Sequence, residues 1–187
     1  MKISFTGAQS TGKTTLLQII ANSPAFRKWS IVHEVTRKVK RTKGVKINND
    51  SEDLDMTQLY ILNEHLNNDN NTGNMVLDRC ILDGYIYTRY LHETGKVSKW
   101  VLEYAENLLS KLLPRIDILY YPNPHDVDLH DDGVRSTDDA FRERIIQLYN
   151  EFFEKGVPCF TKPCPRVVVL SGDVPARLHT ITESLKK

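Results

Sequence analysis

The chain has 187 residues with a formal net charge of +1 at pH 7, and 40% of its residues are hydrophobic. This length and composition are typical of one soluble globular domain, residues 1–187, with a buried core. The near-zero charge gives no overall bias toward nucleic acid or membrane surfaces, and no apolar run approaches the ~20 residues of a membrane span.

The start of the chain and its cysteines bear on the cellular location. Met1 is followed at once by a strand-like segment, which is not typical of a secretory signal peptide. The chain has three cysteines, Cys80, Cys159 and Cys164. Because an odd number of cysteines cannot all pair within one chain, this count favours a reducing compartment over a disulfide framework. We therefore expect a cytoplasmic protein.

Strand-like and helix-like segments alternate along the chain. A β-rich run at 2–6 precedes a helix that begins at Lys13 and ends before Pro24. Further strands are expected at 30–34, 75–78, 117–121 and 166–172. Further helices are expected at 51–66, 81–93, 98–113 and 137–156, and after the N-cap Asp173.

This alternation specifies a fold class. Strands that alternate with helices form a three-layer α/β fold, a doubly wound parallel sheet with helices on both faces. Such sheets bind ligands beyond the carboxyl ends of their strands. One rim should therefore carry the loops at Gly7, Glu34, Asp78, Pro122 and Gly172.

The first of these loops matches a phosphate-binding motif. Residues 7–14, GAQSTGKT, fit G-x-x-x-x-G-K-[ST] in full and lie between a predicted strand and a predicted helix. The backbone N–H groups and the helix N-terminus should face phosphate oxygens, Lys13 should reach the β- and γ-phosphates, and the Thr14 hydroxyl should ligate Mg²⁺. We therefore expect ATP here. The expected nucleotide contacts are Gly7, Ala8, Gln9, Ser10, Thr11, Gly12, Lys13, Thr14 and Thr15.

Acidic residues end two neighbouring strands at the same rim. Glu34 could accept a proton from an attacking hydroxyl, or it is a solvated strand-end acid. Asp78 could hold Mg²⁺ or meet the acceptor hydroxyl, and the adjacent Arg79 could clamp an anionic group; the alternative is an ion pair at a strand end. Because two strand ends deliver acids beside a phosphate loop, we favour a functional role for Asp78.

A segment before the last long helix, DDGVRSTDDAFRER, carries three arginines. Gly133 permits a sharp turn, and Arg135 follows it, which suits a lid that covers the phosphates and neutralises developing charge. Arg142 and Arg144 lie on the helix behind, where they either act in the same way or pair with neighbouring acids. We assign only Arg135 to a lid.

These motifs in their order resemble those of a known family. The phosphate loop GAQSTGKTTL, the HEVTRKV after the second strand, the DR after the third and the DGVR before a long helix are similar to NadR-type ribosylnicotinamide kinases and to the small P-loop ATPases and kinases around them. That group is related to nucleoside and nucleoside-monophosphate kinases. The N-terminal DNA-binding and adenylyltransferase parts of full NadR proteins are not in this sequence.

The resemblance implies a fold and an activity. The fold would be a P-loop NTPase of the nucleotide-kinase type with a helical lid, and the activity would be phosphoryl transfer with Mg²⁺-ATP as donor. The lid would carry Arg135, and the acceptor would be held near Glu34, Arg37 and Asp78.

A basic stretch, RKVKRTKGVK at 37–46, follows the second strand. In P-loop monophosphate kinases the segment in this position holds the acceptor. The stretch would suit an acceptor that already carries phosphate, or a nucleic-acid backbone, whereas the alternative is a solvated loop. With a net charge of +1, a small phosphorylated acceptor is the simpler interpretation.

We predict a phosphotransferase that moves the γ-phosphoryl group of ATP to a nucleoside or nucleotide. Two alternatives stay open, a kinase acting on DNA or RNA at a 5′-hydroxyl or modified base and a regulatory ATPase switch. The predicted catalytic residues are Lys13, Glu34, Asp78, Arg79 and Arg135. The predicted substrate contacts are Glu34, Arg37, Asp78 and Arg79, and the predicted Mg²⁺ ligands are Thr14 and Asp78. The acceptor and the oligomeric state are left open.

Overall fold

Five parallel strands form one sheet in the order β2-β3-β1-β4-β5. The computed structural model describes residues 1–33, 35–43, 53–69, 71–126, 139–155 and 164–186. The strands are β1 (Lys2–Phe5), β2 (Ser30–Val32), β3 (Met75–Asp78), β4 (Ile118–Pro122) and β5 (Arg166–Leu170). All the predicted strands are present, and their parallel pairing brings their carboxyl ends to one rim.

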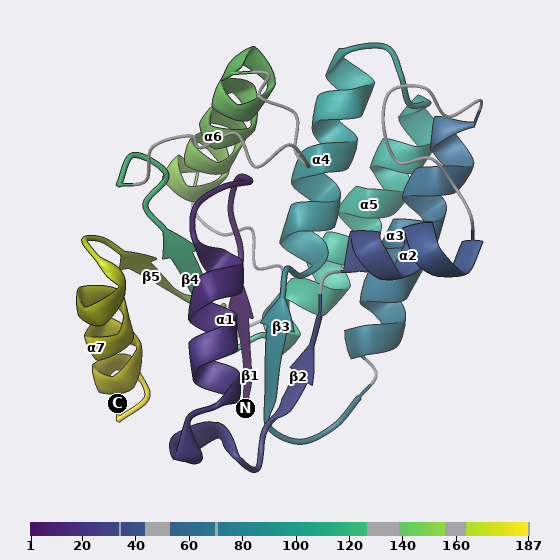
Figure 1. Ribbon diagram of the computed structural model, residues 1–187. Helices are drawn as coiled ribbons and strands as arrows, with labels where there is room; N and C mark the ends of the chain where they lie inside the picture. The colour runs from purple at the N-terminus through teal and green to yellow at the C-terminus, as the bar shows by residue number, and fades with distance from the viewer. Residues whose placement is uncertain (34, 44–52, 70, 127–138, 156–163, 187) are drawn as a thin grey trace.

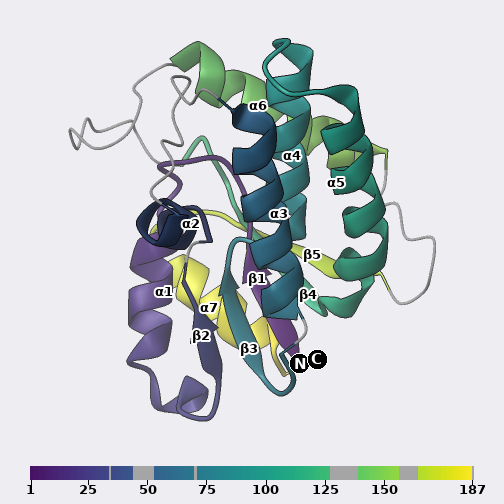
Figure 2. The same cartoon turned by 90° about the vertical axis from the view of Figure 1, so that its right-hand side faces the viewer.

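Helices cover both faces of the sheet, which confirms the three-layer α/β prediction. They are α1 (Lys13–Ala21), α2 (Val35–Lys43), α3 (Leu54–Asp69), α4 (Ile81–Glu93), α5 (Lys99–Leu112), α6 (Asp139–Glu154) and α7 (Val174–Ser184), with short 3-10 turns η1 (Pro24–Phe26) and η2 (Leu113–Arg115). Figure 1 shows α1 and α7 on one face and α4, α5 and α6 on the other. Figure 2 shows α3 beside α4 and α5. None of the described helices is long and apolar enough to cross a membrane.

The strands divide their side chains between two cores. Ile3 and Phe5 of β1 are fully buried and pack with α1 and α7. Leu119 and Tyr121 of β4 are buried on the opposite face, with α4, α5 and α6. Successive side chains of a strand point to opposite faces, so a buried parallel strand supplies apolar residues to both.

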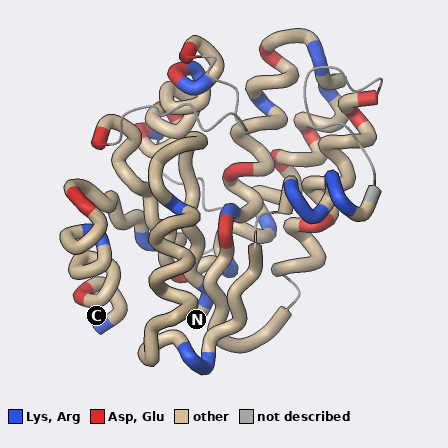
Figure 3. Tube along the Cα trace, in the orientation of Figure 1, with Lys and Arg blue, Asp and Glu red and all other residues tan. Residues whose placement is uncertain are grey.

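The main departure from prediction is α2. We expected a polar basic segment after β2, but 35–43 is helical. Val35 and Val39 lie four residues apart, are nearly fully buried and pack with Ile61 of α3, so α2 is amphipathic. Its Arg and Lys residues form a basic band in Figure 3. Residues 44–46 of the basic stretch lie outside the described part of the chain.

Aspartate side chains cap the first turns of two helices. Asp173, the predicted N-cap of α7, accepts a hydrogen bond from the backbone N of Ala176 at 2.9 Å. Before α3, the carboxylate of Asp53 accepts from the backbone N of Met56 at 3.0 Å. The predicted N-cap of α3, Ser51, lies outside the described residues.

The two cysteines that the structure describes are in different states. Cys80 is a free buried thiol, and burial raises its pKa to about 12. Cys164 is disulfide-bonded. An odd count excludes complete pairing but not a single bridge. This bridge weakens the argument for a reducing compartment, and a cytoplasmic location stays a prediction.

Candidate functional site

The predicted phosphate loop joins β1 to α1 in a conformation that glycine makes accessible. Gly7 and Gly12 have φ values of 132° and 83°, and Ser10 is also left-handed at 58°. A Cβ on Gly7 would lie 3.1 Å from the Tyr121 ring, so the loop packs closely on β4. Gly12 is the N-cap of α1, and no side chain in the described residues caps this helix start. The first-turn N–H groups of α1 therefore remain suited to an anion.

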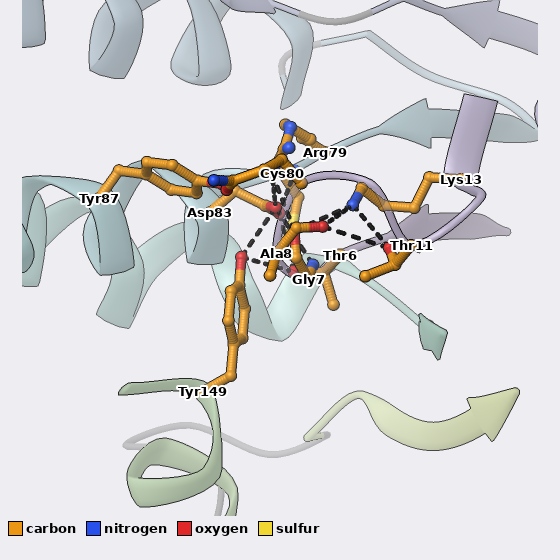
Figure 4. A network of polar contacts seen from close by, with 11 residues as sticks. Thr6, Gly7, Ala8, Thr11, Lys13, Arg79, Cys80, Asp83, Tyr87 and Tyr149 are labelled. Atoms are coloured by element: carbon orange, nitrogen blue, oxygen red, sulfur yellow. Dashed lines mark hydrogen bonds and ion pairs between the residues drawn. The ribbon is translucent and has the colours of Figure 1, made fainter. Parts of the chain in front are cut away.

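Lys13 folds back into the loop it belongs to. Its Nζ donates to the Gly7 carbonyl and the Thr11 hydroxyl, both at 3.0 Å, and also to the Ala8 carbonyl. The side chain is nearly fully buried. Figure 4 shows the ammonium group enclosed by the loop, where it places a positive charge at the centre of the predicted phosphate site.

A buried carboxylate that the sequence analysis missed anchors the base of the loop. Asp83 lies in the first turn of α4, where it forms a capping box with Cys80. Figure 4 shows it at the centre of the polar contacts. It accepts hydrogen bonds from Thr6 Oγ1 at 2.8 Å, Gly7 N at 3.3 Å, Arg79 Nη1 at 2.8 Å, Cys80 N at 3.1 Å and Tyr149 Oη at 2.8 Å.

These donors keep Asp83 ionised. Burial would by itself raise the pKa of Asp83, but the Arg79 and Lys13 charges and the hydrogen bonds outweigh it, so the pKa lies below its ordinary value. Burial and the Asp83 charge together raise the pKa of Tyr149 well above its ordinary value, so this phenol stays protonated and donates to Asp83. The only sequence signal for Asp83 was its place three residues after an N-cap.

Arg79 binds the same loop from the end of β3. Its Nη1 donates to the Gly7 carbonyl at 3.0 Å and to Asp83 at 2.8 Å, and its guanidinium lies 5.3 Å from the centre of the Tyr87 ring. Its φ is 73°, a conformation that costs a non-glycine residue of order 1–3 kcal/mol and that often marks a functional site. Tyr87 itself donates to Gln9 Oε1 at 3.1 Å. Together with the bond from Gly7 N to Asp83, this gives α4 two contacts with the phosphate loop.

Asp78 and Thr14 are the two predicted Mg²⁺ ligands. Asp78 is 7% exposed at the end of β3, where it pairs in register with Phe5, two residues before Gly7. Thr14 is half-buried and Thr15 exposed in the first turn of α1. The structure therefore places both predicted Mg²⁺ ligands next to the loop in the fold.

The remaining predicted site residues are described only in part. Glu34 and the predicted lid arginine, Arg135, lie outside the described residues. Arg37 is exposed on α2. Arg142 donates from Nη2 to the Pro124 carbonyl at 2.6 Å, at the end of β4.

Arg144 turns out to join two helices. It forms ion pairs at 2.8 Å with Glu93 of α4 and Glu151 of α6. Arg89 of α4 pairs with the same two carboxylates, so the four side chains make a network between α4 and α6. Of the two roles left open for Arg144, the structure shows the pairing one.

The parallel sheet, the loop conformation and the enclosed lysine define the class of protein: a P-loop nucleotide-binding fold. Within that class the chain belongs to a family of AAA domains, whose model matches residues 2–177. A search of curated protein sequences gives no match.

Solved structures of nucleoside kinases share this fold. Deoxyadenosine kinase from M. mycoides with dCMP and dCDP bound has a TM-score of 0.69 and 17% identity, and the match covers 100% of this chain and 98% of that chain. The same enzyme with bound dATP has a TM-score of 0.65 and 18% identity over 100% of both chains. NadR in complex with NR has a TM-score of 0.67 and 21% identity over 99% of this chain but 50% of that chain. The expected resemblance to NadR and to nucleoside kinases is therefore confirmed as a likeness of fold.

Proposed function

We propose that the protein transfers the γ-phosphoryl group of Mg²⁺-ATP to a hydroxyl of a nucleoside or nucleotide. The observation that carries the proposal is the complete phosphate loop, with Lys13 enclosed by it and Asp78-Arg79 at the next strand end. The likeness to deoxyadenosine kinase over its whole length supports this activity rather than another P-loop function. Because the described strands form one sheet, we also propose that residues 1–187 act as one domain.

The loop would bind the triphosphate of ATP. Lys13 would exchange the carbonyls of Gly7 and Ala8 for β- and γ-phosphate oxygens, which are stronger acceptors because they are charged. The N–H groups of the loop and of the first turn of α1, up to Thr15, would hold the remaining oxygens.

The donor set at the loop fits Mg²⁺. The ion prefers oxygen ligands and is usually bound through one or two protein groups together with substrate phosphates. A hydroxyl from Thr14 and a carboxylate from Asp78 are such groups. No set of three or more His, Cys, Asp or Glu side chains among the described residues could form a metal cage. The ion would therefore depend on the phosphates and would neutralise part of their charge.

The transfer step needs a base and positive charge. The acceptor oxygen forms a bond to the γ-phosphorus, the bond from the γ-phosphorus to the bridging oxygen of ADP breaks, and the hydroxyl proton passes to Asp78 or Glu34. Arg79, near the phosphates, and Arg135, from the segment before α6, would stabilise the charge on the transferred group. Arg37 on α2 would contact the acceptor.

The experiment measures ADP formation from Mg²⁺-ATP with a panel of acceptors: ribonucleosides, deoxynucleosides, their monophosphates, ribosylnicotinamide and a short DNA duplex. One acceptor should raise the rate strongly, and Lys13→Ala should abolish the increase because the phosphate site loses its central charge. An equally slow rate with every acceptor would contradict the kinase and favour a regulatory ATPase.

The basic residues of α2, which are exposed over 37–41 except for Val39, support a second candidate, a kinase whose acceptor is nucleic acid. Figure 3 shows these basic positions along α2. Binding to a nucleic-acid backbone weakens steeply with salt because counterions are released. If the DNA duplex stimulates turnover and the effect disappears between about 50 and 200 mM salt, this candidate replaces the small-molecule kinase.

A further inference from the structure

A buried arginine from the last helix contacts the phosphate loop. Arg177 of α7 is only 3% exposed. It contacts Thr11 of the phosphate loop, which lies 166 residues earlier in the sequence. Its Nη1 donates to the Thr11 carbonyl at 2.8 Å, and its Nε donates to the Gly172 carbonyl at 2.9 Å. A single guanidinium therefore joins the phosphate loop to the loop after β5.

The carboxylate of Asp126 holds the other side of this arginine. Its Oδ2 lies 3.5 Å from Arg177 Nη2 and accepts from the backbone N of Gly172 at 2.7 Å. Its Oδ1 accepts from Asn123 Nδ2 at 2.7 Å. The loops after β4 and β5 are thus fixed to each other, and both support the position of Arg177.

The contact with Thr11 determines the direction of one peptide group. In a planar trans peptide, the carbonyl of one residue and the N–H of the next point in opposite directions. Because Arg177 holds the Thr11 carbonyl on the α7 side, the Gly12 N–H points away from α7. Gly12 needs its φ of 83° for this arrangement, and a Cβ there would lie 3.4 Å from Arg177 Nη1.

We propose that Arg177 is a positioning residue for phosphate binding: it locks the Thr11–Gly12 peptide so that the Gly12 N–H faces the phosphates. This inference rests on the proposed nucleotide site and extends it, since the motif itself ends at Thr14. Lys13 and Arg79 hold carbonyls at the first half of the loop, and Arg177 holds the second half.

Calorimetric titration with Mg²⁺-ADP and with inorganic tripolyphosphate tests the proposal on the full chain. Arg177→Met should weaken both ligands by about tenfold to a hundredfold, because the loop must reorder its peptide on binding. Arg177→Lys should recover part of the loss, since an ammonium group can still donate to the Thr11 carbonyl. Arg166→Met is the matched control, because Arg166 donates to the Ser184 carbonyl at the other end of α7.

Three results would overturn the proposal. Unchanged affinities with a lowered melting temperature would make Arg177 a purely structural residue. A loss for ADP but not for tripolyphosphate would place its effect at the nucleoside. A wild-type protein that binds neither ligand would show that the nucleotide site itself does not exist.

A wild type that binds both ligands but transfers no phosphoryl group would contradict the kinase and leave this proposal intact. If Arg177→Met fails to fold, Arg177→Lys and Asp126→Asn give the same comparison.

Discussion

At the scale of single residues, the candidate site contains several buried charges in contact with one another. Lys13 and Arg79 bring positive charge to the phosphate loop, and the buried carboxylate of Asp83 interacts with both charges. A buried ion that loses its partner is strongly unfavourable, so such a group is far more sensitive to substitution than an exposed one.

Asp83→Asn should therefore destabilise the protein by about 3 kcal/mol. The amide presents an N–H₂ group to donors such as Thr6 and Tyr149 and removes the negative charge that pairs with Arg79 at 2.8 Å. Urea unfolding measures the change. Asp117→Asn is the control, because this exposed carboxylate accepts one hydrogen bond from the backbone of Lys2, and it should cost less than about 1 kcal/mol. Equal stability of Asp83→Asn and the wild type would show that the buried charge is dispensable.

His65 should make stability depend on pH. Burial lowers the pKa of His65 to about 4, although the nearby Asp83 charge acts in the opposite direction. The unfolded chain then binds more protons than the folded one between about pH 6.5 and 4, so this contribution is complete above pH 6.5 and is lost as pH falls. The loss should be about 2 kcal/mol between pH 7.5 and 5.

Urea unfolding at those two pH values checks this expectation. The pH-dependent loss should be about 2 kcal/mol smaller in His65→Gln than in the wild type. His33→Gln, at an exposed position, should behave like the wild type. An identical pH dependence for His65→Gln and the wild type would mean that His65 is not buried as the neutral form.

At the scale of elements, α4 organises the site because it lies against α3, α5 and α6 and begins beside the phosphate loop. Its Gly84 permits the close approach to α3. A Cβ there would lie 3.1 Å from His65 Cδ2 and 3.2 Å from Leu62 Cδ2. Glycine has a low helix propensity, and the packing against α3 explains its presence within α4.

Gly84→Ala should accordingly lower stability by about 1 kcal/mol. The gain in helix propensity, up to about 1 kcal/mol, is outweighed by an overpacking cost of about 1–3 kcal/mol. Thermal and urea unfolding measure the effect, and a double-mutant cycle with His65→Ala should show that the cost shrinks when the ring is removed. An increase in stability on Gly84→Ala alone would rule out the crowding.

Also at the scale of elements, the sequence predicted a helix or strand correctly where its apolar spacing was not hidden by charged residues. The strands, the helices after them and the cap at Asp173 followed from apolar runs and turn residues. The helix α2 did not, because its many basic residues obscured the two valines that face α3.

At the scale of the whole molecule, the site combines groups that no local pattern connects. The phosphate loop was predictable because its motif is continuous and its strand and helix are adjacent. Asp83, Tyr149 and Arg177 were not, since each comes from a different helix and lies far from its partner in the sequence. The sequence-based assignments of Glu34 and Arg135 stay predictions.

The most direct test of the central claim follows the γ-phosphate itself. Wild-type protein and Lys13→Ala would be incubated with Mg²⁺ and ATP labelled at the γ-phosphate, in the presence of pooled nucleosides, deoxynucleosides and nucleoside monophosphates, and the labelled products separated by chromatography. We predict that the wild type places the label on an organic acceptor and that Lys13→Ala does not. Label recovered only as inorganic phosphate, at a rate independent of the acceptors, would contradict a kinase and leave a nucleotide hydrolase.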